Sequence, residues 1–237
     1  MLPSRVLDIS TSHCKLLESY NKRSEYVALS YCWGADQPAR LTAAKLESYR
    51  VQIDIADLPK TIQEAIMVTR ELGFSYLWVD SMNIIQDDDA DKLQEVAKMR
   101  QIYGDSTLTV CATGARNCNE GFFDTATIPG TTIRTPDVGV NYSCTLPDGS
   151  IGHVRLMERV KYNHGREALT SRAWTCQESL LPVSTVQLGA CLSWECDELA
   201  ERKTLTSLTG GIDSNTPFAV LFAEQKNNRY RMRKVLQ

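Results

Sequence analysis

Between residues 26 and 112 the chain alternates apolar, strand-like runs with amphipathic helical segments, an order that few folds accept. The strand-like runs are short and rich in β-branched and aromatic residues, and they comprise residues 26–32, 75–80 and 106–112. A helical pattern lies between each run and the next. Strand, helix, strand, helix, strand in this order predicts βαβ units, a mostly parallel sheet and an α/β fold.

The two helices carry recognisable signals. Thr61-x-x-Glu64 has the spacing of a capping box at the start of a helix over 61–72, and Gly73 is placed to end it. The acidic run 87–91 suits the start of the second helix, because carboxylates are stabilised by the positive end of the helix dipole. The face predicted to pack on the sheet consists of Leu93, Val96, Ala97, Arg100 and Tyr103.

The remainder of the chain is less regular. Residues 117–165 predict a β-rich insertion, with a turn at 146–149 between short strands, and residues 186–196 predict a further strand pair. Residues 218–237 are helical in tendency and basic at their end. We expect one domain over 1–237. The chain stops without an obvious closing element, as a fragment of a longer protein would.

Composition excludes several classes of protein. With 26 basic and 29 acidic residues in 237, the chain has no basic excess that would favour nucleic acid as its main partner. No run approaches the ~18 apolar residues that cross a bilayer, and no secretory signal is visible at the N-terminus. The eight cysteines are scattered, which favours reduced thiols over a disulfide framework. We therefore expect a cytoplasmic protein with no membrane partner.

Two segments place reactive side chains at predicted strand ends, where parallel α/β sheets bind their ligands. The first is the run Ser30, Tyr31, Cys32, Trp33 and Gly34. The second begins at Trp78 and contributes Asp80 and Asn83. The alternative for the first is an aromatic plug, and for the second it is turn residues that bond local backbone.

A third segment, residues 171–179, contains Trp174 and Glu178 four residues apart, which share a face on a helix. An aromatic ring beside a carboxylate can stack a planar group and stabilise a cation that develops next to it. Arg172 adds an anchor for phosphate or keeps Glu178 ionised. The alternative is a surface helix on which Glu178 is solvated or paired with Arg172.

The sequence gives little support for a metal site or for a phosphate-binding loop. The three histidines do not have the spacing of a zinc site, and the acidic run lacks the alternating ligands and the glycine of a calcium loop, so no metal is expected. Neither GxGxxG nor GxxxxGK[ST] occurs, so no phosphate-cradling loop of those kinds is predicted. No resident cofactor is expected.

Taken together, these segments resemble the fungal heterokaryon-incompatibility (HET) domain. The resemblance rests on residues 26–34 (YVALSYCWG), 58–113, 169–181 (LTSRAWTCQESLL) and 192–196 (LSWEC), which occur in the family order. The chain departs from the family pattern at Asn83, where a cysteine is usual. The family commonly carries an arginine shortly after the Gln-Glu pair that stands here at Gln177 and Glu178. This chain has Val183 and Ser184 in that stretch instead.

The HET family is itself similar to TIR domains, which implies a flavodoxin-like sheet flanked by helices. TIR enzymes that cleave NAD⁺ use a glutamate in the pattern W-x-x-x-E, and Trp174 and Glu178 have that spacing. The resemblance implies Glu178 as the catalytic carboxylate and Trp174 as a wall of the nicotinamide or ribose site. NAD is then a substrate, and its cleavage triggers programmed cell death in fungal non-self recognition.

Two other readings remain open. The same motifs can serve a non-catalytic signalling module that works by self-association, in which Trp33 and Trp174 are packing residues. A HET-like enzyme can also act on another small molecule in secondary metabolism. Self-association is expected with the first two readings.

Overall fold

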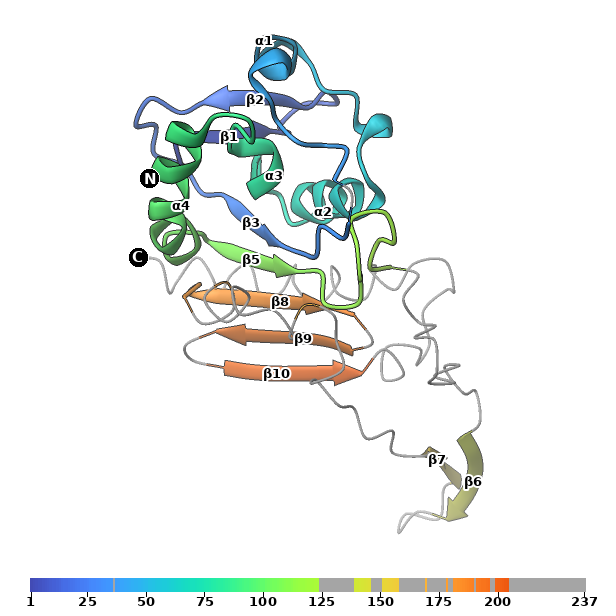
Figure 1. The fold of residues 1–237 in the computed structure, drawn as a ribbon. Helices are drawn as coiled ribbons and strands as arrows, with labels where there is room; N and C mark the ends of the chain where they lie inside the picture. The colour runs from blue at the N-terminus through green and yellow to red at the C-terminus, as the bar shows by residue number, and fades with distance from the viewer. Residues whose placement is uncertain are drawn as a thin grey trace.

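The main sheet of the computed structural model has eight strands in the order β10-β9-β8-β5-β3-β4-β1-β2 (Figure 1). The structure describes residues 1–35, 37–123, 139–145, 151–157, 169, 178, 181–189, 191–196 and 199–204. The strands of the main sheet are β1 (Arg5–Asp8), β2 (Lys15–Glu18), β3 (Val27–Ser30), β4 (Tyr76–Trp78), β5 (Leu108–Cys111), β8 (Ser184–Leu188), β9 (Cys191–Cys196) and β10 (Leu199–Thr204). The helices are α1 (Ala43–Val51), the 3-10 helix η1 (Ile55–Asp57), α2 (Lys60–Glu71), α3 (Asp80–Asn83) and α4 (Asp89–Gly104).

The centre of this sheet is parallel, as the sequence predicts. β3 pairs in parallel with both β4 and β5, and β5 pairs in parallel with β8. Numbered along the chain, these four strands lie in the order 2-1-3-4, which is the order in flavodoxin-like folds. The predicted α/β fold with a flavodoxin-like sheet is therefore confirmed.

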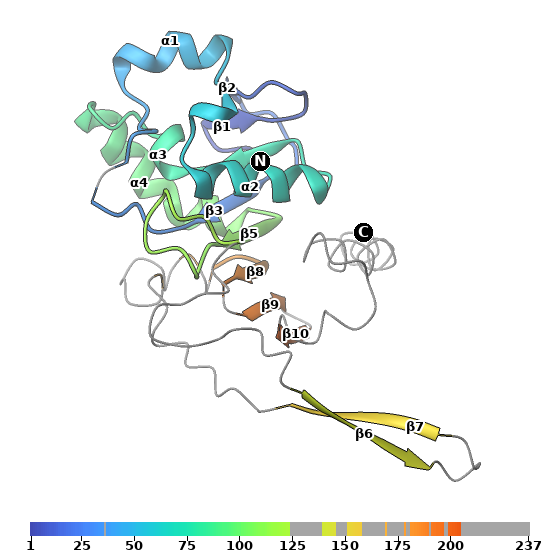
Figure 2. The same ribbon diagram turned by 90° about the vertical axis from the view of Figure 1, so that its right-hand side faces the viewer.

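Antiparallel pairs extend the parallel centre on both sides. β1 pairs with β4 and β2 on one edge, and β9 pairs with β8 and β10 on the other. A separate antiparallel pair, β6 (Gly139–Thr145) and β7 (Ile151–Met157), lies within the predicted β-rich insertion, away from the main sheet (Figure 2). The predicted turn at 146–149 and the predicted helical stretch 218–237 lie outside the described residues.

Helices α2 and α4 cover opposite faces of the parallel strands (Figure 1). Side chains alternate along each strand, so one set packs under each helix. Val27, Leu29 and Val110 belong to the larger core, with the apolar residues of α2. Ala28 and Trp78 belong to a second core, with Ile102 and Tyr103 of α4. No helix among the described residues has the length and apolarity of a transmembrane span.

Helix α2 lies close to its predicted bounds but does not begin with a capping box. Its N-cap is Pro59, which makes no side-chain cap hydrogen bond. Thr61 and Glu64 both lie inside the helix and bond to residues 117–123 instead. The C-terminal prediction is confirmed, because Gly73 follows the helix with a φ of +83°.

Helix α4 begins where the acidic run predicts, with the Asp88 side chain accepting hydrogen bonds from the backbone N–H groups of Ala90 and Asp91. The predicted packing face is wrong. Leu93 is 77% exposed and Val96 47% exposed, and only Tyr103 of that set is buried. The buried residues of the helix are instead Glu95, whose carboxylate bonds Lys98, and Ile102 and Tyr103, which enter the second core.

The cysteines that the structure describes with their side chains, Cys14, Cys32, Cys111 and Cys118, are all free and buried. Burial raises the pKa of the Cys14 thiol to about 12. These four thiols agree with the prediction of reduced cysteines.

Candidate functional site

The candidate site lies at the carboxyl ends of the central parallel strands, on the face covered by α4. Ser30 ends β3 and stands beside Cys111, the last residue of β5, in the parallel register. Ala28, two residues earlier, shares a face with Ser30 and packs among the α4-side core residues. Asp80 follows β4 by two residues and opens the short helix α3. Three strand ends therefore deliver polar side chains to one edge of the sheet.

Glu178 reaches this edge from a distant part of the chain. The Ser30 hydroxyl donates a hydrogen bond to Glu178 Oε2, although the two residues are 148 positions apart. Both side chains are removed from solvent, with Ser30 1% and Glu178 8% exposed. The solvated surface position considered for Glu178 is therefore not what the structure shows.

Trp33 and Asp80 form a second contact at the same edge. The Trp33 indole Nε1–H donates to both carboxylate oxygens of Asp80, at 3.0 and 2.9 Å. Asp80 Oδ1 also accepts the backbone N–H of Ser81 at 2.6 Å, so the carboxylate is fixed from two sides. Trp33 is only partly buried and packs against the α2-side core.

Two buried aromatic rings, Trp78 and Tyr103, lie on the α4 side of the sheet near this edge. Trp78 and Tyr103 meet edge to face, with ring centroids 5.5 Å apart. The Tyr103 hydroxyl donates to the carbonyl oxygen of Leu29 at 3.2 Å. Burial raises the pKa of Tyr103 well above its ordinary value, and the negative charges of Glu178 and Asp80 raise it further. Tyr103 thus stays neutral, and both carboxylates act on the same phenol.

The other residues of the first two predicted segments make separate contacts. Tyr31 lies on the α2 side, where its hydroxyl donates to Ser81 Oγ at 2.8 Å and accepts from Gln37 Nε2 at 2.6 Å. Burial is the main reason that the pKa of Tyr31 is raised well above its ordinary value, and Asp80 adds to the effect. Cys32 is buried in a small cluster with Cys111 and Leu169.

Asn83 forms hydrogen bonds that hold the backbone around it. It is fully buried, and its Oδ1 accepts the backbone N–H of Val79 at 2.6 Å. Its carbonyl oxygen accepts from Arg5 Nε at 2.7 Å, and Arg5 also pairs with Asp91 at 2.5 Å. These bonds hold the turn between β4 and α4.

Arg172 and Trp174 lie outside the described residues, so the geometry of the W-x-x-x-E pair is described only at Glu178. Tyr103 and Cys111 are site neighbours that the sequence did not single out. Cys111 could have been found, because it lies next to the end of the third predicted strand, 106–112. Among the described residues, no three histidine, cysteine or acidic side chains gather as a metal site would require.

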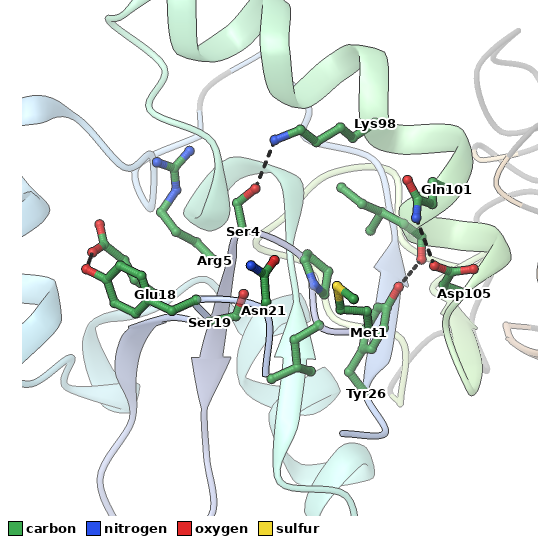
Figure 3. A pocket seen from close by; sticks show the side chains of 14 residues that line it. Met1, Ser4, Arg5, Glu18, Ser19, Asn21, Tyr26, Lys98, Gln101 and Asp105 are labelled. Atoms are coloured by element: carbon green, nitrogen blue, oxygen red, sulfur yellow. Dashed lines mark hydrogen bonds between the residues drawn. The ribbon is translucent and has the colours of Figure 1, made fainter. Parts of the chain in front are cut away.

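A pocket of about 530 Å³ lies at the opposite, amino edge of the sheet (Figure 3). Tyr26 precedes β3 and Asp105 precedes β5, and both line it together with the N-terminal segment. Lys98 reaches across it to Ser4 Oγ at 3.0 Å. None of the residues predicted for the site lines this pocket.

Residues 26–178 match the family model "Heterokaryon incompatibility protein (HET)". No curated protein and no solved structure matches the chain. The matched region covers more than half of the 237 residues and runs from the start of the Tyr26–Gly34 segment to Glu178. The chain therefore belongs to the heterokaryon incompatibility (HET) family.

Proposed function

We propose that this HET domain cleaves the nicotinamide–ribose bond of NAD⁺, with Glu178 as the catalytic carboxylate. The observation that carries the proposal is the buried Glu178 carboxylate, held by Ser30 at the carboxyl ends of the parallel strands. Family membership indicates a role in heterokaryon incompatibility. Loss of NAD⁺ would then be the step that leads to cell death.

The reaction requires from the protein mainly one well-placed negative charge. The C1′–N bond breaks, its electron pair goes to the nicotinamide nitrogen, and the pyridinium leaves as neutral nicotinamide. The ribose becomes oxocarbenium-like, as in glycoside hydrolysis, and a carboxylate against it stabilises the positive charge. Water adds to C1′ and releases one proton, which gives ADP-ribose.

The surroundings of Glu178 suit the planar, positively charged nicotinamide ring of bound NAD⁺. The Asp80 carboxylate holds the edge of the Trp33 indole, so the ring has a defined orientation beside the site. Tyr103 adds a neutral aromatic floor. Trp174 is proposed as a further wall on its spacing from Glu178 alone.

The test is nicotinamide release from NAD⁺ by the purified protein at high concentration. We expect Glu178→Gln to lower the rate by about 100-fold or more, because the variant keeps the shape of the side chain and removes the charge that stabilises the transition state. Glu95→Gln is the matched control, since it removes another buried carboxylate, one that bonds Lys98 on α4. Equal rates for wild type and Glu178→Gln would remove the role assigned to Glu178.

A second candidate function is self-association without catalysis. The observation that favours it is the exposed apolar pair Leu93 and Val96 on α4, in a helix whose other face packs on the sheet. Large exposed apolar patches mark protein–protein contacts, and this pair would form part of one on α4. A HET-like enzyme acting on another small molecule keeps the same site, and a panel of nucleotides in the same assay separates it from NAD⁺ cleavage.

A further inference from the structure

We infer that Ser30 is the positioning residue of Glu178: its hydroxyl fixes the carboxylate at the end of β3 and favours the ionised form. The inference rests on the proposed function for its effect on catalysis. The contact between the two side chains is itself independent of any substrate. Ser30 then acts by holding Glu178 and not by contacting the substrate.

The backbone at Ser30 is a rigid support. All four residues of β3 are buried, and Ser30 pairs with Cys111 of β5. The Ser30 carbonyl oxygen accepts the backbone N–H of Ala112 at 2.9 Å. One residue earlier, the Leu29 carbonyl accepts the Tyr103 hydroxyl. A short side chain on this support leaves the Oγ atom few positions to occupy.

The charge balance around Glu178 gives the hydroxyl its importance. Burial disfavours a charged carboxylate, and so does the like charge of Asp80 at the same edge. The Tyr103 phenol, on which both carboxylates act, is buried as well. A hydroxyl that donates to the carboxylate favours its ionised form. An ionised Glu178 is the form that can stabilise a ribosyl cation.

The kinetic test compares Ser30→Ala with Ser30→Thr, which keeps the hydroxyl. Hydrogen bonds to charged groups are worth ~1.5–3 kcal/mol, so loss of the donor moves the acid limb of the kcat profile up by about one pH unit or more. At neutral pH we expect kcat to fall about tenfold, because the carboxylate is no longer held in position, and KM to change less than twofold. Ser30→Thr should restore both the rate and the pH profile.

The matched control is Thr69→Ala. Thr69 is fully buried on α2, and its hydroxyl donates to the Ala65 carbonyl at 2.7 Å, on the other face of the sheet. Its loss removes one buried hydroxyl bond and should leave the pH profile unchanged. If Ser30→Ala and Thr69→Ala alter kcat and its pH dependence alike, Ser30 acts only through stability and the inference is overturned.

A second measurement needs no activity. The carbon-13 resonance of the Glu178 carboxyl, assigned by its loss in Glu178→Gln, is followed as a function of pH. The titration midpoint should lie about one pH unit higher in Ser30→Ala than in wild type, and an unchanged midpoint overturns the inference. A shifted midpoint in a protein that releases no nicotinamide supports the Ser30–Glu178 inference and refutes the proposed function.

Discussion

At Gly34 the backbone takes a φ of +80°, and the chain packs directly on Asn117. A Cβ atom placed on Gly34 would lie 2.5 Å from Asn117 Cβ. Only glycine satisfies both conditions without strain. Gly34 is therefore explained by a close approach of two backbone segments beside the Trp33–Asp80 contact, whether or not a ligand also uses the space.

We expect Gly34→Ala to destabilise the protein by about 2 kcal/mol or more, because a left-handed conformation and a steric overlap add together. Urea unfolding measures the difference. The Asn117→Gly substitution removes the overlapping Cβ. Gly34→Ala should therefore destabilise the Asn117→Gly variant by less than it destabilises the wild type. An alanine that costs less than about 0.5 kcal/mol would show that the loop rearranges freely.

Asn83 shows why residue type alone did not settle the site. Asparagine after a strand end is equally suited to a ligand and to a turn, and both readings were open from the sequence. In the fold its carbonyl is bonded to Arg5 and its side chain to Val79. Arg5 lies 78 residues away in the sequence, so a pattern of neighbouring residues cannot predict this partner.

At the scale of elements, the first turn of α2 holds the loop that follows β5. The Glu64 carboxylate, almost fully buried, accepts the backbone N–H groups of Phe122 and Phe123, at 2.5 and 3.1 Å. The Thr61 hydroxyl accepts from Gly121 N–H at 3.2 Å. A Cβ on Gly121 would lie 2.5 Å from Glu64 Oε1, so the loop and the helix fit closely.

Replacing Glu64 by alanine should cost about 3 kcal/mol, because two buried N–H groups lose the acceptor that replaces water. Chemical denaturation measures this value. Glu47→Ala is the control, since Glu47 lies on an exposed turn of α1 and its pairing with Arg50 is largely solvated. The two variants should differ clearly. Similar losses would mean that the α2–loop contact adds little to stability.

Helix α4 illustrates the limit of periodicity. Its start was predictable, because an acidic N-terminal turn and an Asp cap leave a local signature. Its packing face was not, since the apolar residues Leu93 and Val96 recur at helical spacing yet point outward. Glu95 is buried with its carboxylate paired to Lys98, and an apolar pattern does not reveal a buried carboxylate.

At the scale of the whole molecule, the exposed pair Leu93 and Val96 gives the self-association reading a direct test. We expect Leu93→Gln/Val96→Gln to weaken self-association by about tenfold or more, since burial of two apolar side chains is lost. Unfolding free energy should change by less than about 0.5 kcal/mol. Light scattering over a range of concentrations measures the association.

Met67→Gln is the matched control for that experiment. Met67 is also exposed and apolar, at 53%, and lies on α2 across the sheet. It should leave association unchanged. An equal effect of both variants would point to general surface hydrophobicity, and no effect of the α4 variant would exclude α4 as the contact.

The sequence by itself determined the parallel centre of the sheet, the helices α2 and α4, the pair β8 and β9, and the membership of the HET family. These features depend on signals within a few residues or on long motifs in a set order. Only the tertiary structure decided the edge strands β1, β2 and β10, whose segments the sequence pattern did not single out. It also decided which polar groups meet, above all Ser30 and Glu178. The reason is physical: a buried polar side chain is stable only with its partner, and these partners are brought together by folding across many residues.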